Sequence, residues 1–335
     1  MSEFAFGRNF DLQTRPEHRY MVDGITTLHK FNSAYVQSLD LVKYHMEKIF
    51  SPQGLWYGWK FLQIARKLAE SRNLPNTTMN PGVFWQMSNF QETSNANKFS
   101  MDELWAESKF LMVTGGWSPA SALASLLFYL SRYPSCHRRV TAEVRSIFDK
   151  ASEIHSGSQM TSCHYLRACI LESLRMSPPG GAVLWREVER NAMMIDGHAV
   201  PPGCDVGTGM YSIHHNENYF PDSFTFKPER WLDDDQRVCQ NLDQGHRAFT
   251  AFSIGPRSCL GRSLVMMELT DIAALLLWHL DFRLPAGPEA QIGAGTEGLR
   301  GRHRIDEFQQ RDHIFSFFDG PCLEFRQRHF DISIK

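Results

Sequence analysis

The sequence predicts a mainly α-helical fold with small β-sheets towards the C-terminal half of the chain. Three observations support this prediction. Apolar residues recur at helical spacing in several long stretches. In the second half, segments rich in glycine and proline lie between these stretches. The 335 residues show neither an internal repeat nor an interdomain linker. We therefore expect residues 1–335 to form one domain, long enough to bury a large core.

The first long helix with a clear start is predicted at Ser100. The first ninety residues already have a mostly helical pattern. Ser100 and Glu103 are three residues apart, which is the spacing of a capping box. Apolar residues then continue from Leu104 to Val113 and from Leu123 to Leu130, so we expect one long helix here.

A second amphipathic helix is predicted around residues 166–175. Its apolar residues recur at helical spacing, namely Leu166, Cys169, Ile170 and Leu174. Glu172 and Arg175 lie three residues apart, so their side chains meet on one face of this helix. Taken alone, the two residues would form an ordinary surface ion pair, which contributes little to stability.

The segment between residues 195 and 216 predicts a β-hairpin followed by mixed strand and helix. Ile195–Gly203 is rich in turn-forming residues. His214 and His215 are adjacent and therefore point in different directions, so we interpret them as structural histidines rather than metal ligands. The segment Gly207-Thr-Gly209 is too short to be a nucleotide-binding loop. Surface loops are predicted at Asp149–Met160, Asp233–Arg247 and Ala286–His303.

The most informative segment is Phe252-Ser-Ile-Gly255-Pro-Arg257-Ser-Cys259-Leu-Gly261, just ahead of the apolar run Leu264–Trp278, which predicts a helix. A thiol at a helix N-terminus meets free backbone N–H groups and the positive end of the helix dipole, and both favour the thiolate. Gly255 permits a tight turn, and Gly261 lets a flat group approach the backbone. Arg257 supplies a permanent cation, and Phe252 shields the sulfur from water. A lone cysteine in this position is usually a small buried hydrophobic residue, but five specified positions in ten residues form a specific signal.

This segment resembles the haem-binding loop of the cytochrome P450 family of haem-thiolate monooxygenases. The resemblance implies that Cys259 is the axial ligand of the iron of haem b, and that Arg257 pairs with a haem propionate. Phe252, Gly255 and Gly261 are then the remaining cofactor-binding residues of the loop. An axial thiolate pushes electron density onto the iron and favours cleavage of the O–O bond.

Three further segments carry the same resemblance. Glu172 and Arg175, together with Arg230 in Pro228-Glu-Arg-Trp231, resemble the family's buried charge triad, which has a structural role. Removing one member of such a triad leaves a buried partner unpaired. Phe220–Trp231 resembles fungal members of secondary metabolism, and Asp312–Arg326 resembles the closing β-hairpin of the same enzymes.

The resemblance also suggests where a propionate and a substrate lie. Arg186, in Trp185-Arg-Glu-Val188, matches a family position that often binds a propionate. Pro179–Val183 and Ser316–Phe318 match substrate-lining segments, which makes Val183 and Phe317 candidate pocket residues. These assignments rest on analogy with the family.

The segment Thr114-Gly-Gly-Trp117-Ser118-Pro119 departs most from the family. The family has a small residue, a glycine, any residue, an acid, a threonine and then a threonine or serine, and the downstream match of Leu126–Leu130 fixes the register. Trp117 then occupies the acid position and Ser118 the alcohol position, so Ser118 is the expected catalytic residue. The acid and the alcohol normally relay protons during oxygen activation.

This departure leads to a hypothesis about activity. An indole N–H is no proton relay at neutral pH, so Trp117 cannot replace the acid. Pro119 removes a helical N–H and is expected to kink or widen the helix. We therefore expect impaired oxygen activation, with reducing equivalents lost as hydrogen peroxide, or chemistry that bypasses dioxygen. The alternative is that water or substrate hydroxyl groups substitute for the acid.

Composition narrows the class of protein. A net charge of −2 argues against non-specific binding of nucleic acid. The seven cysteines form no Cys-x-x-Cys pair, and their odd number without a signal peptide indicates a reducing compartment. No stretch approaches the roughly 18 consecutive apolar residues that span a bilayer.

Fungal relatives normally carry an N-terminal membrane anchor, a β-region and early helices, and this sequence begins beyond them. We therefore expect a partial cytochrome P450 domain that covers the C-terminal two-thirds of the family fold, from an incomplete gene model or a fragment that is not independently active. The resemblance places a full-length relative at the endoplasmic reticulum membrane, on its cytosolic face. Without an anchor, this chain would be cytoplasmic.

The expected function is a haem-thiolate monooxygenase that oxidises a small organic substrate, a fungal secondary metabolite. Electrons would come from NADPH through a separate cytochrome P450 reductase, since the sequence contains no flavin or nicotinamide motif. Two alternatives stay open. One is a non-catalytic remnant, and the other is a haem-thiolate isomerase or dehydratase that needs no external electrons.

Overall fold

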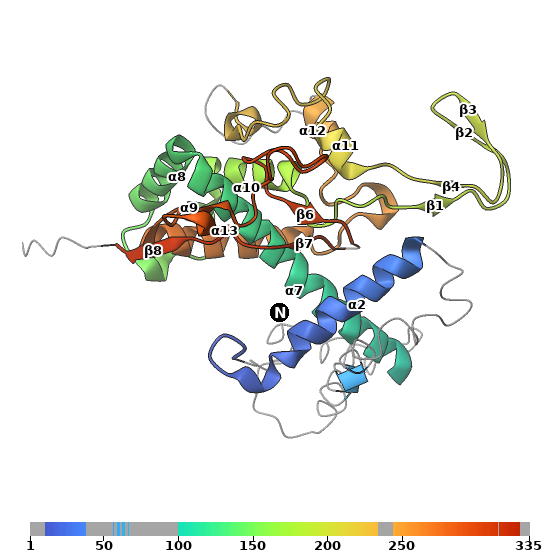
Figure 1. Ribbon diagram of the computed structural model, residues 1–335, viewed down its shortest axis with the longest axis horizontal. Helices are drawn as coiled ribbons and strands as arrows, with labels where there is room; N and C mark the ends of the chain where they lie inside the picture. Colours follow the sequence, from blue (N-terminus) through green and yellow to red (C-terminus); the bar gives the residue numbers. More distant parts are fainter. Residues whose placement is uncertain are drawn as a thin grey trace, which may run out of the picture. The chain divides into compact units, whose positions relative to one another are not determined.

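The computed structural model describes residues 11–37, 56, 59–60, 62–63, 66, 100–233, 244–313 and 315–328. Its contacts divide the chain into two compact units, Met1–Ser118 and Pro119–Lys335. The boundary falls inside the long helix α7 (Met101–Arg132), which is teal in Figure 1. The expectation that residues 1–335 form one domain stays a prediction.

The described part of the first unit is helical, as the sequence pattern predicts. A short 3-10 helix, η1 (Pro16–His18), leads into α2 (Tyr20–Gln37). The capping box at the start of α7 is confirmed: the Ser100 N–H donates to a Glu103 carboxylate oxygen at 2.6 Å, and the Glu103 N–H donates to Ser100 Oγ at 3.2 Å. Helix α7 continues through Pro119 to Arg132 without interruption.

The second unit holds the remaining described elements. Its α-helices are α8 (Pro134–Ile147), α9 (Ser158–Thr161), α10 (His164–Met176), α11 (Met210–His214), α12 (Gln244–Ala248) and α13 (Arg262–His279). Its 3-10 helices are η2 (Ala151–Glu153), η3 (Pro228–Trp231), η4 (Gly255–Arg257) and η5 (Pro288–Gln291). The predicted helices around residues 166–175 and 264–278 are thus confirmed as α10 and α13. Within the described part of the chain, none of the helices combines the length and apolar character that a membrane crossing requires.

The strands of this unit form antiparallel pairs. β1 (Arg186–Glu187) pairs with β4 (Asp205–Val206), β2 (Met193–Ile195) with β3 (His198–Val200), β5 (Leu280–Arg283) with β8 (Glu324–Gln327), and β6 (Gln310–Arg311) with β7 (Phe317–Phe318). The predicted hairpin is confirmed as β2–β3. Its turn residues Asp196 and Gly197 have φ values of 48° and 77°, as a two-residue type I′ turn requires. A mainly helical fold with small sheets is therefore confirmed.

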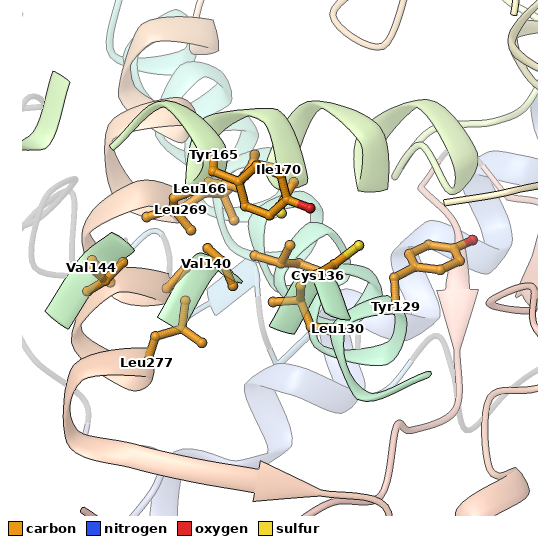
Figure 2. Packing of buried hydrophobic residues seen from close by; sticks show 14 of the residues in the cluster. Tyr129, Leu130, Cys136, Val140, Val144, Tyr165, Leu166, Ile170, Leu269 and Leu277 are labelled. Atoms are coloured by element: carbon orange, nitrogen blue, oxygen red, sulfur yellow. The ribbon is translucent and has the colours of Figure 1, made fainter. Parts of the chain in front are cut away.

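The core of the second unit lies between α8, α10, α13 and the C-terminal part of α7. Figure 2 shows Val140 and Val144 of α8 pointing towards Leu269 and Leu277 of α13, with Leu166 of α10 above them. Each of these side chains is at most 2% exposed. This packing holds α10, which carries Glu172 and Arg175, and α13, which follows the segment with Cys259.

Two predicted loops contain helical turns instead. Asp149–Met160 includes η2 and the start of α9, because Ile154 and Met160 are only 7% and 5% exposed and tie the segment to the core. Ala286–His303 includes η5, which begins at Pro288, a residue suited to a first helical position. In Asp233–Arg247, helix α12 begins at Gln244, and residues 234–243 lie outside the described residues.

The segment Asp312–Arg326 is not one closing hairpin, which corrects the expectation from the sequence. β7 turns back on β6, whereas β8 pairs with β5, the strand that follows α13. The reason is packing, because Phe282 of β5 is 6% exposed and its ring lies 5.8 Å from the ring of Phe325 in β8.

Candidate functional site

The Cys259 loop, which we define as Phe252–Gly261, is held by its own backbone. The Cys259 N–H donates to the Phe252 carbonyl at 2.7 Å, and the Ser258 N–H donates to the Gly255 carbonyl at 3.0 Å. Gly255 has a φ of +71°, in the left-handed region that favours glycine. These bonds close a tight turn that delivers Cys259 three residues before the first residue of α13.

The surface around the Cys259 thiol is apolar and open. Cys259 is exposed, and the side chains of Ile254 and Leu260 are 68% and 101% exposed. Gly261 adds to the open space, because a Cβ built there would meet only Cys259 Sγ, at 3.9 Å. Exposed apolar side chains that lie together are typical of a binding surface.

The other loop residues take different positions. The Phe252 ring is half-buried, and the guanidinium of Arg262 lies 5.5 Å from its centroid. Arg257 is exposed on η4. Helix α13 is 18 residues long and begins three residues after Cys259, and the Arg262 N–H at its start donates to the Cys259 carbonyl at 3.4 Å.

Two cavities flank the loop and share Ser253 and Ile254. One, of about 370 Å³, is also lined by Arg186 and Thr250. The other, of about 450 Å³, is lined by Phe252 and by basic and aromatic side chains, namely Arg167, Trp231, His246, Arg247, Phe249 and Arg262. The structure therefore brings Arg186 to the same cavity as the Cys259 loop. The Arg186 guanidinium donates to the neighbouring Trp185 carbonyl at 2.7 Å.

Glu172, Arg175 and Arg230 are brought together by the structure. Glu172 and Arg175 are 0% exposed, and both nitrogens Nε and Nη2 of Arg175 donate to the Glu172 carboxylate at 2.9 Å. Arg230 Nε donates to the same carboxylate at 3.0 Å. Sequence reasoning missed two further donors, which are Trp231 Nε1 at 2.9 Å and the Lys227 N–H at 3.1 Å. The Glu172 carboxylate is thus surrounded by donors.

A link between this charge network and Thr250, two residues before the Cys259 loop, was also missed. His214 Nδ1 contacts the Arg175 carbonyl at 3.0 Å, and the Thr250 N–H donates to His214 Nε2 at 2.9 Å. Since Nε2 accepts, the proton lies on Nδ1, which donates to the carbonyl. The imidazole also stacks on Phe249, with the ring planes 13° apart. No local sequence signal pointed to this link, because Thr250 lies 36 residues after His214.

The contacts of His214 and His215 are those of histidines with a structural role. Burial lowers the pKa of His214 to about 3 and that of His215 to about 4. His215 Nδ1 lies 2.9 Å from the Tyr211 carbonyl. Both imidazoles are therefore neutral at physiological pH, and neither charges the cavity beside the Cys259 loop.

Val183 and Phe317 do not line a common cavity. Val183 lines one of about 350 Å³ together with Tyr211 and Glu307, whose side chains share a hydrogen bond of 2.5 Å. Phe317 is 6% exposed and lines a separate cavity of about 170 Å³. That these two residues line a substrate pocket stays a prediction.

In the first unit, the expected catalytic Ser118 lies on α7 and is half-buried. Its hydroxyl donates to the Thr114 carbonyl at 2.8 Å, one helical turn earlier. The neighbouring Trp117 contacts His29 of α2, with ring centroids 5.9 Å apart and ring planes inclined by 52°. His29 was not singled out from the sequence, because α2 carries no motif around it.

The residues around Cys259 fit a haem group. They supply a thiol at the head of a long helix, an open apolar surface beside the sulfur, and a glycine that leaves room for a flat ring. Arg257 and Arg186 are exposed cations from two different elements. This donor set is suited to an iron porphyrin with carboxylate side groups.

Comparison with known proteins agrees with this chemistry. The family model described as Cytochrome P450 matches residues 1–298. The chain is 36% identical over 329 residues to a cytochrome P450 monooxygenase of Gibberella zeae, covering 98% of this chain and 75% of that protein. It is 35% identical over 331 residues to cytochrome P450 monooxygenase AKT7 of Alternaria alternata, and the match covers 98% of this chain and 63% of AKT7. A third relative, cytochrome P450 monooxygenase lcsN of Purpureocillium lilacinum, is 31% identical over 328 residues, covering 98% and 96%.

The chain belongs to the cytochrome P450 family. The proteins that it resembles are fungal monooxygenases of that family. It spans 63% of the length of AKT7 and 62% of the length of cytochrome P450 monooxygenase apf7 of Gibberella fujikuroi.

Proposed function

We propose that this chain carries the catalytic part of a haem-thiolate monooxygenase that inserts one oxygen atom into a small organic substrate. The Cys259 loop carries the proposal, because it presents a thiol at the N-terminus of α13 within an open apolar surface. The family and its fungal relatives support the same reaction class. We extend the proposal to a fungal secondary metabolite as substrate, by the resemblance of Phe220–Trp231.

Each residue of the proposed site has a physical role. Haem b, when bound, supplies the chemistry of oxygen activation. Cys259 Sγ would hold the haem iron through its sulfur. Arg257 and Arg186 pair with the propionates, and a guanidinium offers paired donors suited to a carboxylate. With haem bound, the Phe252 ring would help to shield the sulfur from water, and Gly255 and Gly261 would let the backbone approach the haem ring.

Ser118 is the proposed distal hydroxyl. Its O–H donates to the Thr114 carbonyl, and its oxygen lone pairs stay available to accept a proton from a donor. Trp117, in place of an acid, offers a hydrogen-bond donor but no acidic proton at neutral pH. We therefore propose that oxygen activation is less efficient than in relatives with an acid here, and that part of the reducing equivalents leaves as hydrogen peroxide.

The proposed electron donor is a separate NADPH–cytochrome P450 reductase, which members of this family generally use. We propose that a full-length relative works on the cytosolic face of the endoplasmic reticulum membrane, where such a reductase would be reached. The substrate is a small molecule, and neither the net charge of −2 nor any motif favours nucleic acid.

A second candidate function is favoured by one observation, the tryptophan at the acid position. A haem-thiolate isomerase or dehydratase needs no delivered protons for oxygen activation and no external electrons. The two functions differ in one measurement. Conversion of a candidate metabolite without NADPH and dioxygen favours the isomerase or dehydratase, and strict dependence on both favours the monooxygenase.

The assignment of Cys259 is tested by Cys259→Ala in the purified, haem-loaded chain. We expect the variant to lose the thiolate-specific Soret band of the ferrous carbonyl complex. Cys204→Ala is the matched control, because Cys204 is also a free thiol outside the core and lies away from the loop in sequence. A Cys259→Ala protein that keeps the band would refute the assignment.

A further inference from the structure

The imidazole of His214 uses both of its ring nitrogens inside the protein. His214 is the last residue of α11 and is 0% exposed. Its Nδ1 lies 3.0 Å from the Arg175 carbonyl, and the Thr250 N–H donates to its Nε2 at 2.9 Å. Burial lowers the pKa of His214 to about 3, so the ring is neutral and donates at one nitrogen while it accepts at the other. The imidazole therefore joins the C-terminal end of α10 to the segment before the Cys259 loop.

Two backbone hydrogen bonds continue from Thr250 to Cys259. The Ser253 N–H donates to the Thr250 carbonyl at 2.7 Å, which closes a turn over residues 250–253. Ser253 has a φ of 57°, in the left-handed region that residues other than glycine rarely adopt, so this turn needs support from its surroundings. The Cys259 N–H donates to the Phe252 carbonyl, inside the same turn, at 2.7 Å. The place of Cys259 thus depends on the turn that begins at Thr250.

Aromatic packing fixes the orientation of the His214 ring. The ring stacks on Phe249, with centroids 5.5 Å apart and planes inclined by 13°, and meets the edge of Phe220 at 6.1 Å and 81°. In Figure 1, α11 is drawn beside α12, the helix that ends at Ala248. A ring held in this way has one direction for Nε2, which is towards the Thr250 N–H.

We propose that His214 is a positioning residue of the haem-thiolate site. By accepting the Thr250 N–H, it holds the turn that places Cys259 Sγ for the haem iron. This inference rests on the proposed function. Its physical reason is that the strained turn has the Cys259 loop on one side and the buried imidazole on the other, so the imidazole ties the loop to the rigid end of α10.

The neighbouring His215 provides a matched control. It is 8% exposed, and its Nδ1 lies 2.9 Å from the Tyr211 carbonyl one turn earlier. Its ring stacks on Tyr211 and packs against Phe224, and both of these residues lie outside the Cys259 loop. His214 and His215 thus share residue type, burial and position in the fold, but differ in the contact that the proposal depends on.

Two substitutions of His214 separate its two hydrogen bonds. A glutamine amide reaches about as far as Nε2, so its oxygen can accept the Thr250 N–H. An asparagine amide reaches only about as far as Nδ1, so it can donate to the Arg175 carbonyl but not accept from Thr250. Both changes remove the stacked ring. A merely structural histidine would therefore give two similar variants, whereas a positioning histidine makes His214→Asn the worse of the two.

The first arm of the test measures amide hydrogen exchange by mass spectrometry in the haem-free chain. The peptides cover residues 249–261, and a peptide from residues 134–147 of α8 reports on the core. Relative to the α8 peptide, we expect His214→Asn to accelerate exchange at 249–261 at least about tenfold, and His214→Gln much less. His215→Asn should leave this ratio unchanged. Equal ratios in the two His214 variants, or the same acceleration in His215→Asn, overturn the proposal.

The second arm measures the ferrous carbonyl spectrum of the haem-loaded chain. The measured quantity is the share of haem that shows the thiolate-specific Soret band. We expect His214→Asn to lower this share at least about twofold, while His214→Gln and His215→Asn stay near the unmodified chain. An unchanged share in His214→Asn overturns the positioning role.

Nitrogen NMR of the unmodified chain keeps the proposal testable if His214→Asn does not accumulate. The signals of His214 are assigned by their absence in His214→Gln. We expect an unprotonated Nε2 and a protonated Nδ1, and a protonated Nε2 overturns the proposal because it could not accept from Thr250. If the thiolate band is absent from the unmodified chain, the proposed function fails. The exchange and NMR measurements then still decide whether His214 holds the turn.

Discussion

The charge network of Glu172 and the Cys259 loop lie in the same compact unit but are built in opposite ways. Glu172 is 0% exposed and accepts hydrogen bonds from Arg175, Arg230, Trp231 and a backbone N–H. The Cys259 loop is fixed by its backbone, while its sulfur and the neighbouring Leu260 are exposed. In the Glu172 network, the protein's own donors satisfy the buried carboxylate. The Cys259 loop has an ordered backbone, but its sulfur is exposed.

This difference separates the residues that hold the fold from those that bind a cofactor. A buried carboxylate surrounded by donors is costly to disturb, because its partners lose their counter-charge inside the protein. An exposed thiol can be changed with little effect on the chain, since no packing depends on it. His214 joins the charge network to the segment just before the Cys259 loop, through the Arg175 carbonyl on one side and the Thr250 N–H on the other.

The sharpest test of the comparison is Glu172→Ala, for which we expect the largest effect. The change leaves the buried guanidinium of Arg175 and the largely buried guanidinium of Arg230 without their counter-charge, at a cost of about 3–5 kcal/mol in the free energy of unfolding. Soluble, haem-loaded protein should fail to accumulate. The measurement is urea unfolding followed by circular dichroism, together with haem content after expression.

The matched control for Glu172→Ala is Arg283→Ala. Arg283 pairs with Glu324 at 2.7 Å, but the side chains are 81% and 46% exposed. An exposed ion pair contributes about 0–1 kcal/mol, so this variant should unfold nearly like the unmodified chain. Equal, small losses in both variants would contradict the view that the Glu172 network is a buried structural element.

The second test uses pH and the residue that joins the two regions. Burial lowers the pKa of His214 to about 3, below the value of about 6.5 for an exposed histidine. Between these two pH values, the His214 side chain therefore binds a proton in the unfolded chain but not in the folded chain. The stabilisation is complete above about pH 6.5 and is lost as the pH falls towards 3. Between pH 7 and pH 5, His214 alone should account for a loss of about 2 kcal/mol.

The measurement is urea unfolding at pH 7, 6 and 5 for the unmodified chain and for His214→Gln. We expect the variant to be less stable at pH 7 and to show a shallower decline towards pH 5. His198→Gln, on exposed β3, should keep the full decline. An unchanged slope in His214→Gln would show that His214 is not buried as a neutral imidazole.

The sequence predicted those elements whose signals lie within a few neighbouring residues. Ser100 and Glu103 are three residues apart, as are Glu172 and Arg175, and such spacing reports directly on a helix. It missed contacts between distant segments. The His214–Thr250 hydrogen bond, the pairing of β5 with β8 and the contact of His29 with Trp117 join residues between 36 and 88 positions apart. Only tertiary packing sets these contacts, so no window of sequence contains them.

The third test concerns Gly207, which sequence reasoning treated only as part of a segment too short for a nucleotide loop. A Cβ at this position would lie 2.3 Å from Val183 Cγ1 and 3.0 Å from the Trp185 ring. Gly207→Ala must therefore displace the side chains of Val183 and Trp185, which come just before Arg186 in the chain, at a cost of about 1–3 kcal/mol. Gly116→Ala is the control, because a Cβ there meets nothing within 4 Å and the residue lies inside α7.

The control should be neutral or stabilising by about 0.5–1 kcal/mol, since alanine is a better helix former than glycine. Both variants are compared by thermal and urea unfolding. If Gly207→Ala also lowers haem retention while Gly116→Ala does not, the segment around Arg186 supports the cofactor cavity as well as the fold. Equal stability of the two variants would show that the chain around Val183 moves freely.

The smallest effect is expected for Cys259→Ala in haem-free protein, and this result would separate the two regions most clearly. The thiol is exposed, so its removal should change the free energy of unfolding by no more than about 0.5 kcal/mol. Addition of haem should then distinguish the proteins. A group that binds only the folded chain stabilises it by about 2.7 kcal/mol at one hundred times its dissociation constant. We expect this gain in the unmodified chain and a much smaller one in Cys259→Ala. A large loss of stability in the haem-free variant would mean that the Cys259 loop holds the fold as the Glu172 network does.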